Sequence, residues 1–152
     1  MLPHVDLALY DRDGQLIAIA EVKNKVGTSR EWAAKLRRNI LAHGGFRTID
    51  FFLLVTPDRL YLWKDAGGEP TPVDPTYEVD AHPLLEPYFA GAGMNPADVS
   101  GRAFELVVAA WLADLVRSEG SRENLADQQR WLAESGFLDA IRNGRLEYEV
   151  AA

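Results

Sequence analysis

Two stretches near the start of the chain decide the fold: Val5-Asp6-Leu7-Ala8-Leu9-Tyr10 and Leu16-Ile17-Ala18-Ile19-Ala20-Glu21-Val22-Lys23. Both are rich in apolar residues, and the first alternates in the way that is typical of a strand. The segment between them contains Asp13-Gly14, and Asp-Gly is a strong signal for a β-hairpin turn. The sequence therefore predicts two antiparallel strands joined by a short loop.

Three charged residues interrupt these apolar strands: Asp6, Glu21 and Lys23. Glu21 and Lys23 are two residues apart, so they share a face. A two-residue loop at Asp13-Gly14 places Asp6 directly opposite Glu21, whereas a four-residue loop over 11–14 places it diagonally. Opposed pairs are ~4.5–5.5 Å apart and diagonal pairs ~7–8 Å. A loop of three or five residues, or a bulge, would put the carboxylates on different faces.

Two carboxylates at such distances repel each other unless a proton or a cation lies between them. Oxygen ligands suit Mg²⁺ or Mn²⁺, which keep bound waters and also bind phosphate oxygens. A neighbouring lysine can hold a water molecule or stabilise charge that develops on a phosphate. The three side chains therefore indicate metal-assisted hydrolysis of a phosphodiester.

The rest of the chain predicts an α/β protein with a mixed sheet. Thr28-Ser29-Arg30-Glu31 is typical of a capping box with Thr28 at the N-cap, and Trp32, Ala33, Leu36 and Ile40 form one apolar stripe on the helix that follows. A strand, a helix and a second strand imply one parallel pair, and hairpins imply antiparallel pairs. The expected elements are a helix over 29–43, strands over 51–56 and 60–64, a loop over 65–75, short turns over 83–89, helices over 100–117, 125–134 and 137–142, and an edge strand over 146–150.

This order of elements, together with Asp6 and Glu21-Val22-Lys23, resembles the core of the PD-(D/E)xK nuclease superfamily, which includes many restriction endonucleases. The resemblance covers about the first 64 residues and implies that Asp6, Glu21 and Lys23 are catalytic. It also implies a Mg²⁺ or Mn²⁺ ion held by Asp6, Glu21 and the backbone carbonyl of Val22. DNA is the expected substrate, and the following helix often adds a polar residue near the site, for which Lys35 and Arg38 are the candidates.

The chain departs from the family pattern at two points. His4 and Val5 separate Pro3 from Asp6, and almost nothing precedes the Asp6 strand, where the family has a helix and a strand. The C-terminal helices, the strand over 146–150 or a second chain are the candidates for completing the core. We therefore expect a restriction-endonuclease-like core over residues 1–66 and an acidic, mainly helical accessory lobe over residues 76–152.

Charge is divided unevenly between these two parts. The whole chain carries −7, but residues 1–64 carry +3 and the remainder carries −10. An acidic lobe repels DNA, so it is expected to contact a basic partner protein, to orient the nuclease core or to form a homodimer. The candidates for contacts with the DNA backbone lie in the first half, where the alternative is a solvated helix face: Lys25, Arg30, Lys35, Arg37 and Arg38.

Several classes of function are excluded or disfavoured. The chain has no cysteine, which excludes disulfides, thiolate metal sites and cysteine nucleophiles. The N-terminus lacks the basic region of a signal peptide, and the apolar run over 106–112 is far shorter than the ~20 residues that span a bilayer. We expect a soluble cytoplasmic protein. Three hypotheses remain: a metal-dependent nuclease, a non-catalytic nuclease-fold subunit that binds DNA or a partner, and an interaction domain whose hairpin charges form salt bridges.

Overall fold

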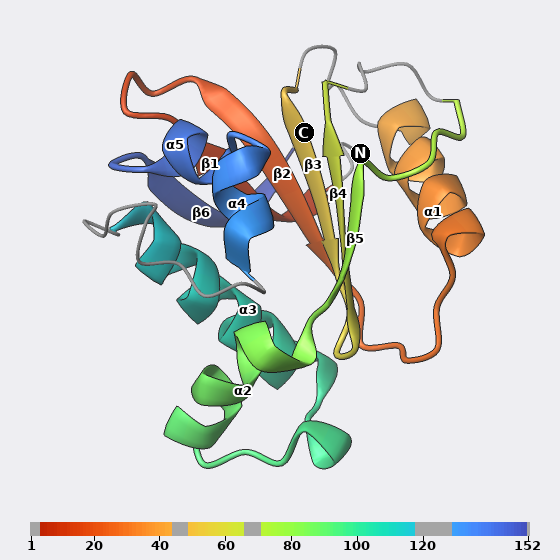
Figure 1. Cartoon of the computed structure of the whole chain (residues 1–152), viewed down its shortest axis with the longest axis vertical. Coiled ribbons are helices and arrows are strands. Elements are labelled where there is room, and N and C mark those ends of the chain that lie inside the picture. Colours follow the sequence, from red (N-terminus) through yellow and green to blue (C-terminus); the bar gives the residue numbers. More distant parts are fainter. Residues whose placement is uncertain (1–3, 44–48, 66–70, 118–128, 152) are drawn as a thin grey trace.

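A six-stranded sheet forms the centre of the computed structural model, which describes residues 4–43, 49–65, 71–117 and 129–151 (Figure 1). Its strands lie side by side in the order β5-β4-β3-β2-β1-β6. β2 and β3 run parallel, whereas every other neighbouring pair is antiparallel. The predicted α/β class with a mixed sheet is therefore confirmed. The strands are β1 (His4–Tyr10), β2 (Leu16–Val22), β3 (Phe51–Val55), β4 (Arg59–Lys64), β5 (Tyr77–Asp80) and β6 (Arg145–Ala151).

Helices cover both faces of the sheet (Figure 1). One face carries α1 (Arg30–His43), which connects β2 with β3 and so makes their parallel pairing possible. The opposite face carries α2 (His82–Gly91), the 3-10 helix η1 (Pro96–Asp98), α3 (Gly101–Val116), α4 (Arg130–Glu134) and α5 (Phe137–Ile141). No helix in the described part of the chain is long and apolar enough to cross a membrane.

Apolar side chains fill the space on each side of the sheet. Because side chains alternate along a strand, Ile19 of β2 packs in the layer beneath α1, and Ala18 and Ala20 pack in the layer beneath α2 to α5. The larger layer includes Phe104 and Trp111 of α3, both at most 2% exposed. Every strand from β1 to β4 therefore has buried residues on both faces, as expected for strands covered by helices on both sides.

The β1–β2 hairpin combines two irregularities whose effects on register cancel. Tyr10 pairs with Leu16 across a five-residue loop, but Leu9 pairs with Ala18, so Ile17 is a bulged residue without a partner. Either feature alone would put alternate residues on the wrong face. Together they restore the register in which Leu7 faces Ala20, which is the register that a two-residue loop would have given. The Asp11 carboxylate closes the loop by accepting the N–H groups of residues 13 and 15, each at 2.9 Å.

The last strand, β6, completes the sheet beside β1. Its register with β1 runs from Tyr10 opposite Arg145 to His4 opposite Ala151. β5, which the sequence did not predict, forms the other edge beside β4. Residues 76–152 thus supply both edge strands as well as four of the described α-helices.

Helix α2 replaces the short turns predicted over 83–89. Its two prolines explain why the sequence did not predict a helix. Pro83 is in the first turn, where the backbone N–H needs no partner within the helix. Pro87 removes only one backbone hydrogen bond of a short helix. Burial of Leu84, Leu85 and Phe89 against the sheet and α3 offsets that loss.

Helix boundaries also differ from expectation. α1 begins at Arg30, and Ser29 rather than Thr28 caps it, because Ser29 Oγ accepts the N–H of Trp32 at 3.1 Å. The helix predicted over 125–134 is described from Arg130 only, and its first residues lie outside the described ranges.

Gly144, just before β6, is predicted to be essential for docking this strand. A Cβ atom there would collide with the backbone carbonyl of Tyr10 and press against the carbonyl of Ile141. Because these are backbone atoms, we expect Gly144→Ala to lower the free energy of unfolding by ~1–3 kcal/mol. Thermal melting should show a fall in Tm of roughly 3–10 °C.

Gly101→Ala is the matched control, because a Cβ at Gly101 meets nothing within 4 Å. Its Tm should stay at or slightly above that of the wild type. Equal melting of the two variants would contradict the close approach between Gly144 and β1.

Candidate functional site

Asp6 and Glu21 meet where the main-chain pairing of β1 and β2 stops. The β1–β2 register ends with Leu7 opposite Ala20, so Asp6 and Glu21 are the next pair along the two strands. At this point the Asp6 carboxylate, rather than a β1 carbonyl, accepts the backbone N–H of Val22, with Oδ2 2.8 Å from the nitrogen. A side chain therefore holds this end of the hairpin together.

Glu21 is the buried member of the pair. It is 4% exposed, and its Oε1 atom is buried and has no hydrogen-bond partner among the described residues. Burial and, second to it, the neighbouring Asp6 carboxylate together raise the pKa of Glu21 to about 8, while Lys23 acts in the opposite direction. A carboxylate in this position needs a proton or a cation beside it to be stable.

Val22, the last residue of β2, and Lys23, the residue after it, complete the group. In a strand, the N–H and C=O of one residue point to the same side. Since the Val22 N–H points toward Asp6, its carbonyl also faces the β1 side, where the two carboxylates lie. Lys23 is half-buried, and its backbone N–H donates to the carbonyl of Val55 on β3. Its positive charge acts to lower the pKa of Glu21. The structure thus brings together all four residues that the sequence assigned to this site.

The loop after Lys23 is held by three contacts that the sequence did not predict. The Asn24 amide donates to the carbonyl of Val99 at 3.0 Å, and the N–H of Gly27 donates to the Asp58 carboxylate at 3.1 Å. The Thr28 hydroxyl lies 2.8 Å from the phenol oxygen of Tyr61, which is fully buried. These contacts fix where the chain goes after the site, and their only signal in the sequence is a set of polar residues just beyond strand ends.

The five basic residues proposed for DNA contact differ in their exposure and in their partners. Lys25 and Lys35 are exposed, and Lys25 Nζ lies 5.4 Å from the ring centre of Trp32. Arg30 forms an ion pair with Glu78 at 3.3 Å, and Arg38 is half-buried and donates to Asn39.

Arg37 departs from the expectation for this set. It is 1% exposed, its guanidinium lies 5.8 Å from the ring centre of Trp63, and burial lowers its pKa. It faces the layer between α1 and the sheet, because it follows Ala33 by four residues on the buried stripe. Arg37 is therefore a packing residue in this structure and not a surface contact.

The metal donors near Asp6 are few. Within the described ranges, no group of three or more His, Cys, Asp or Glu side chains is arranged to hold a metal ion. The hairpin offers two carboxylates and one backbone carbonyl. That donor set fits Mg²⁺, which takes one or two carboxylates and fills its remaining positions with waters and substrate oxygens.

Comparison with known proteins assigns no family. No protein-family model matches the chain, and no curated protein or solved structure gives a significant match.

The raised pKa of Glu21 predicts a pH-dependent stability in the absence of metal. The fold favours the neutral form of Glu21. Its contribution to the free energy of unfolding is therefore complete below the ordinary pKa of 4.5 and is lost as the pH rises to about 8. Glu21→Gln keeps the shape and removes the ionisation. Relative to this variant, the wild type should lose on the order of a few kcal/mol between pH 5 and pH 8.5.

Urea denaturation of both proteins at the two pH values, in EDTA, measures this difference. Other titrating groups are shared, so they cancel in the comparison. Stability curves that stay parallel from pH 5 to pH 8.5 would show that Glu21 is not held as the neutral acid.

Proposed function

We propose that this protein is a divalent-metal-dependent nuclease that hydrolyses phosphodiester bonds, with DNA as a better substrate than RNA. One observation carries the proposal: the nearly fully buried Glu21 carboxylate has an oxygen without a described partner and lies beside a second carboxylate, Asp6. The hydrogen bond from the Val22 N–H gives Asp6 a structural role, but it gives no reason for a second, buried acid beside it. Cation binding gives such a reason.

The residues divide the work as follows. Asp6, Glu21 and the Val22 carbonyl would hold Mg²⁺ or Mn²⁺. A bound ion of this kind polarises a phosphoryl oxygen and lowers the pKa of a water molecule. Lys23, two residues from Glu21 on the same face, donates to the water or to a phosphate oxygen and stabilises the developing negative charge.

Two exposed cations in the segment that follows the site support a polyanionic substrate. Lys25, in the loop before α1, and Lys35, on α1, have ammonium groups that are available to phosphates. The likeness of Asp6 and Glu21-Val22-Lys23, followed by a helix and a strand, to PD-(D/E)xK nucleases supports DNA over RNA.

A second candidate is a non-catalytic nuclease-fold subunit that binds DNA or a partner protein. Burial of Arg37 and the ion pair between Arg30 and Glu78 favour a subunit that binds a partner protein, because they leave fewer cations free for DNA. The two candidates differ in whether the metal site cleaves.

Cleavage is the first test. The wild type should cut plasmid or linear DNA in Mg²⁺ or Mn²⁺, and Glu21→Gln and Lys23→Ala should each lower the rate at least ~100-fold. Single-stranded DNA and RNA in parallel reactions give the substrate class. Matched controls are Glu134→Gln and Lys64→Ala, both at exposed positions outside the site, which should cut like the wild type.

Metal binding is measured separately by thermal melting. Mg²⁺ or Mn²⁺ should raise the Tm of the wild type but not of Glu21→Gln, because binding to the native state alone stabilises it. A metal-dependent rise in Tm without cleavage would favour the non-catalytic subunit. If neither cleavage nor a rise in Tm is observed, the hairpin charges act only as structural salt bridges.

A further inference from the structure

The turn between β3 and β4 holds both ends of the loop that follows β2. At the first end, the backbone N–H of Lys23 donates to the carbonyl of Val55, the last residue of β3, at 2.9 Å. At the other end, the backbone N–H of Gly27 donates to the Asp58 carboxylate, with 3.1 Å between the nitrogen and Oδ2. Because Val55 and Asp58 belong to the same short segment, one turn fixes both ends of the loop.

The Asp58 carboxylate is itself held by its own turn. Its Oδ1 accepts the hydroxyl of Thr56 at 3.1 Å, and the Thr56 hydroxyl oxygen accepts the N–H of Arg59 at 3.0 Å. Thr56 is fully buried, and its backbone N–H donates to the Arg59 carbonyl at 2.9 Å. The Asp58 side chain therefore cannot turn away from Gly27 without losing its bond to the buried Thr56 hydroxyl.

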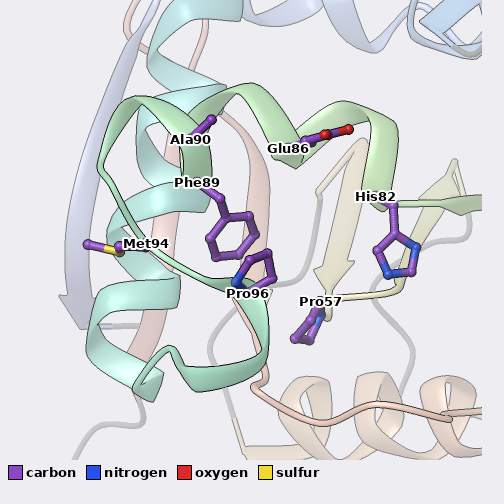
Figure 2. Close-up of a pocket in the computed structure, with 7 residues that line it drawn as sticks. All are labelled: Pro57, His82, Glu86, Phe89, Ala90, Met94 and Pro96. Atoms are coloured by element: carbon purple, nitrogen blue, oxygen red, sulfur yellow. The ribbon is translucent and has the colours of Figure 1, made fainter.

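On its other side, this turn borders a pocket of about 330 Å³ (Figure 2). Pro57 lines the pocket from the turn, and Phe89 and Pro96 line it from α2 and η1. The backbone carbonyl of Asp58 accepts the N–H of Ala81, just before α2, at 3.3 Å. Because space is left beside the turn, its position depends on the hydrogen bonds of Asp58 as well as on packing.

The loop between the two fixed ends is short and tightly turned. The backbone N–H of Lys25 donates back to the Lys23 carbonyl at 2.9 Å, so the chain turns directly after Lys23. Gly27 has a φ of +70°, a left-handed conformation that other residues rarely adopt. The contact of the Asn24 amide with its carbonyl partner is exposed, so it competes with water. Since only residues 24–26 separate the two ends, a displacement of Gly27 is passed on to Lys23.

We propose that Asp58 is a positioning residue for Lys23. In the cleavage proposed above, on which this role rests, the Lys23 ammonium group has to meet a water molecule or a phosphate oxygen beside the metal ion. A misplacement of about 1 Å can lower a rate about 100-fold. By holding Gly27, the Asp58 carboxylate keeps the Lys23 backbone at the place from which its side chain shares a face with Glu21. Asp58 acts through the loop and is not one of the metal donors.

Cleavage kinetics of the full-length protein test this role. Asp58→Ala removes the bond to Gly27 and should lower kcat at least ~10-fold. KM and the Mg²⁺ concentration at half-maximal rate should stay unchanged, because the hairpin holds the metal donors. Asp58→Asn should restore most of the rate, since its amide oxygen can still accept the Gly27 N–H and its NH₂ group can donate to the Thr56 hydroxyl.

A second measurement reports on Lys23 without cleavage. Brief acetylation of the folded protein in EDTA, read by mass spectrometry, compares the half-buried Lys23 with the exposed Lys64 at the end of β4. In Asp58→Ala, the Lys23 amine should react several times faster relative to Lys64, because the loop opens more often. Asp58→Asn should return this ratio to the wild-type value.

Asp11→Ala is the matched control. The Asp11 carboxylate also accepts two hydrogen bonds at a turn, but its turn lies at the opposite end of β2 from Lys23. Asp11→Ala and Asp58→Ala should therefore show similar falls in Tm. Asp11→Ala alone should keep the wild-type kcat and the wild-type acetylation of Lys23.

The role of Asp58 is overturned if Asp58→Ala cuts like the wild type, or if Asp11→Ala shows the same losses. A lower kcat with unchanged acetylation of Lys23 would also overturn it, because Asp58 would then act by another route. A wild-type protein that does not cut would contradict the proposed nuclease. The acetylation ratio would still decide whether Asp58 holds Lys23 in place.

Discussion

The hydrogen bond from the Val22 N–H to the Asp6 carboxylate replaces a main-chain bond between β1 and β2. It turns the Asp6 side chain toward β2 and holds it beside Glu21, where regular pairing would have continued the ladder. The bond depends on register, and the register depends on a five-residue loop and the bulged Ile17 acting together. The structure therefore tolerates two irregularities in one hairpin because only their sum keeps the acids on one side.

Local patterns were enough to predict most of the fold, and long-range packing decided the rest. The hairpin, α1, β3, β4 and α3 have strong strand or helix periodicity and appear close to their expected bounds. β5 was missed because it has four residues with alternating exposure and is defined mainly by its neighbour β4. Helix α2 was missed because prolines are usually helix breakers, and only burial of Leu84, Leu85 and Phe89 outweighs them.

The same division applies to the candidate site. Asp6, Glu21 and Lys23 could be predicted because charges in apolar strands need a compensating interaction. Burial of Arg37 could not, since a basic residue on a helix is usually solvated and only the position of Trp63 shows otherwise. Gly27 and Thr28 are distant in sequence from their partners Asp58 and Tyr61, so a single sequence does not show which of these polar groups meet.

Pairing of β1 with β6 joins residues from opposite ends of the described chain. Such contacts close a very long loop, and proteins that depend on them fold slowly because this entropy is lost before the contacts stabilise the chain. During synthesis on the ribosome, β1 is made before β6 and remains without this neighbour until residues 145–151 emerge. The strand that carries Asp6 is therefore an open sheet edge in the nascent chain, exposed to mispairing until β6 covers it.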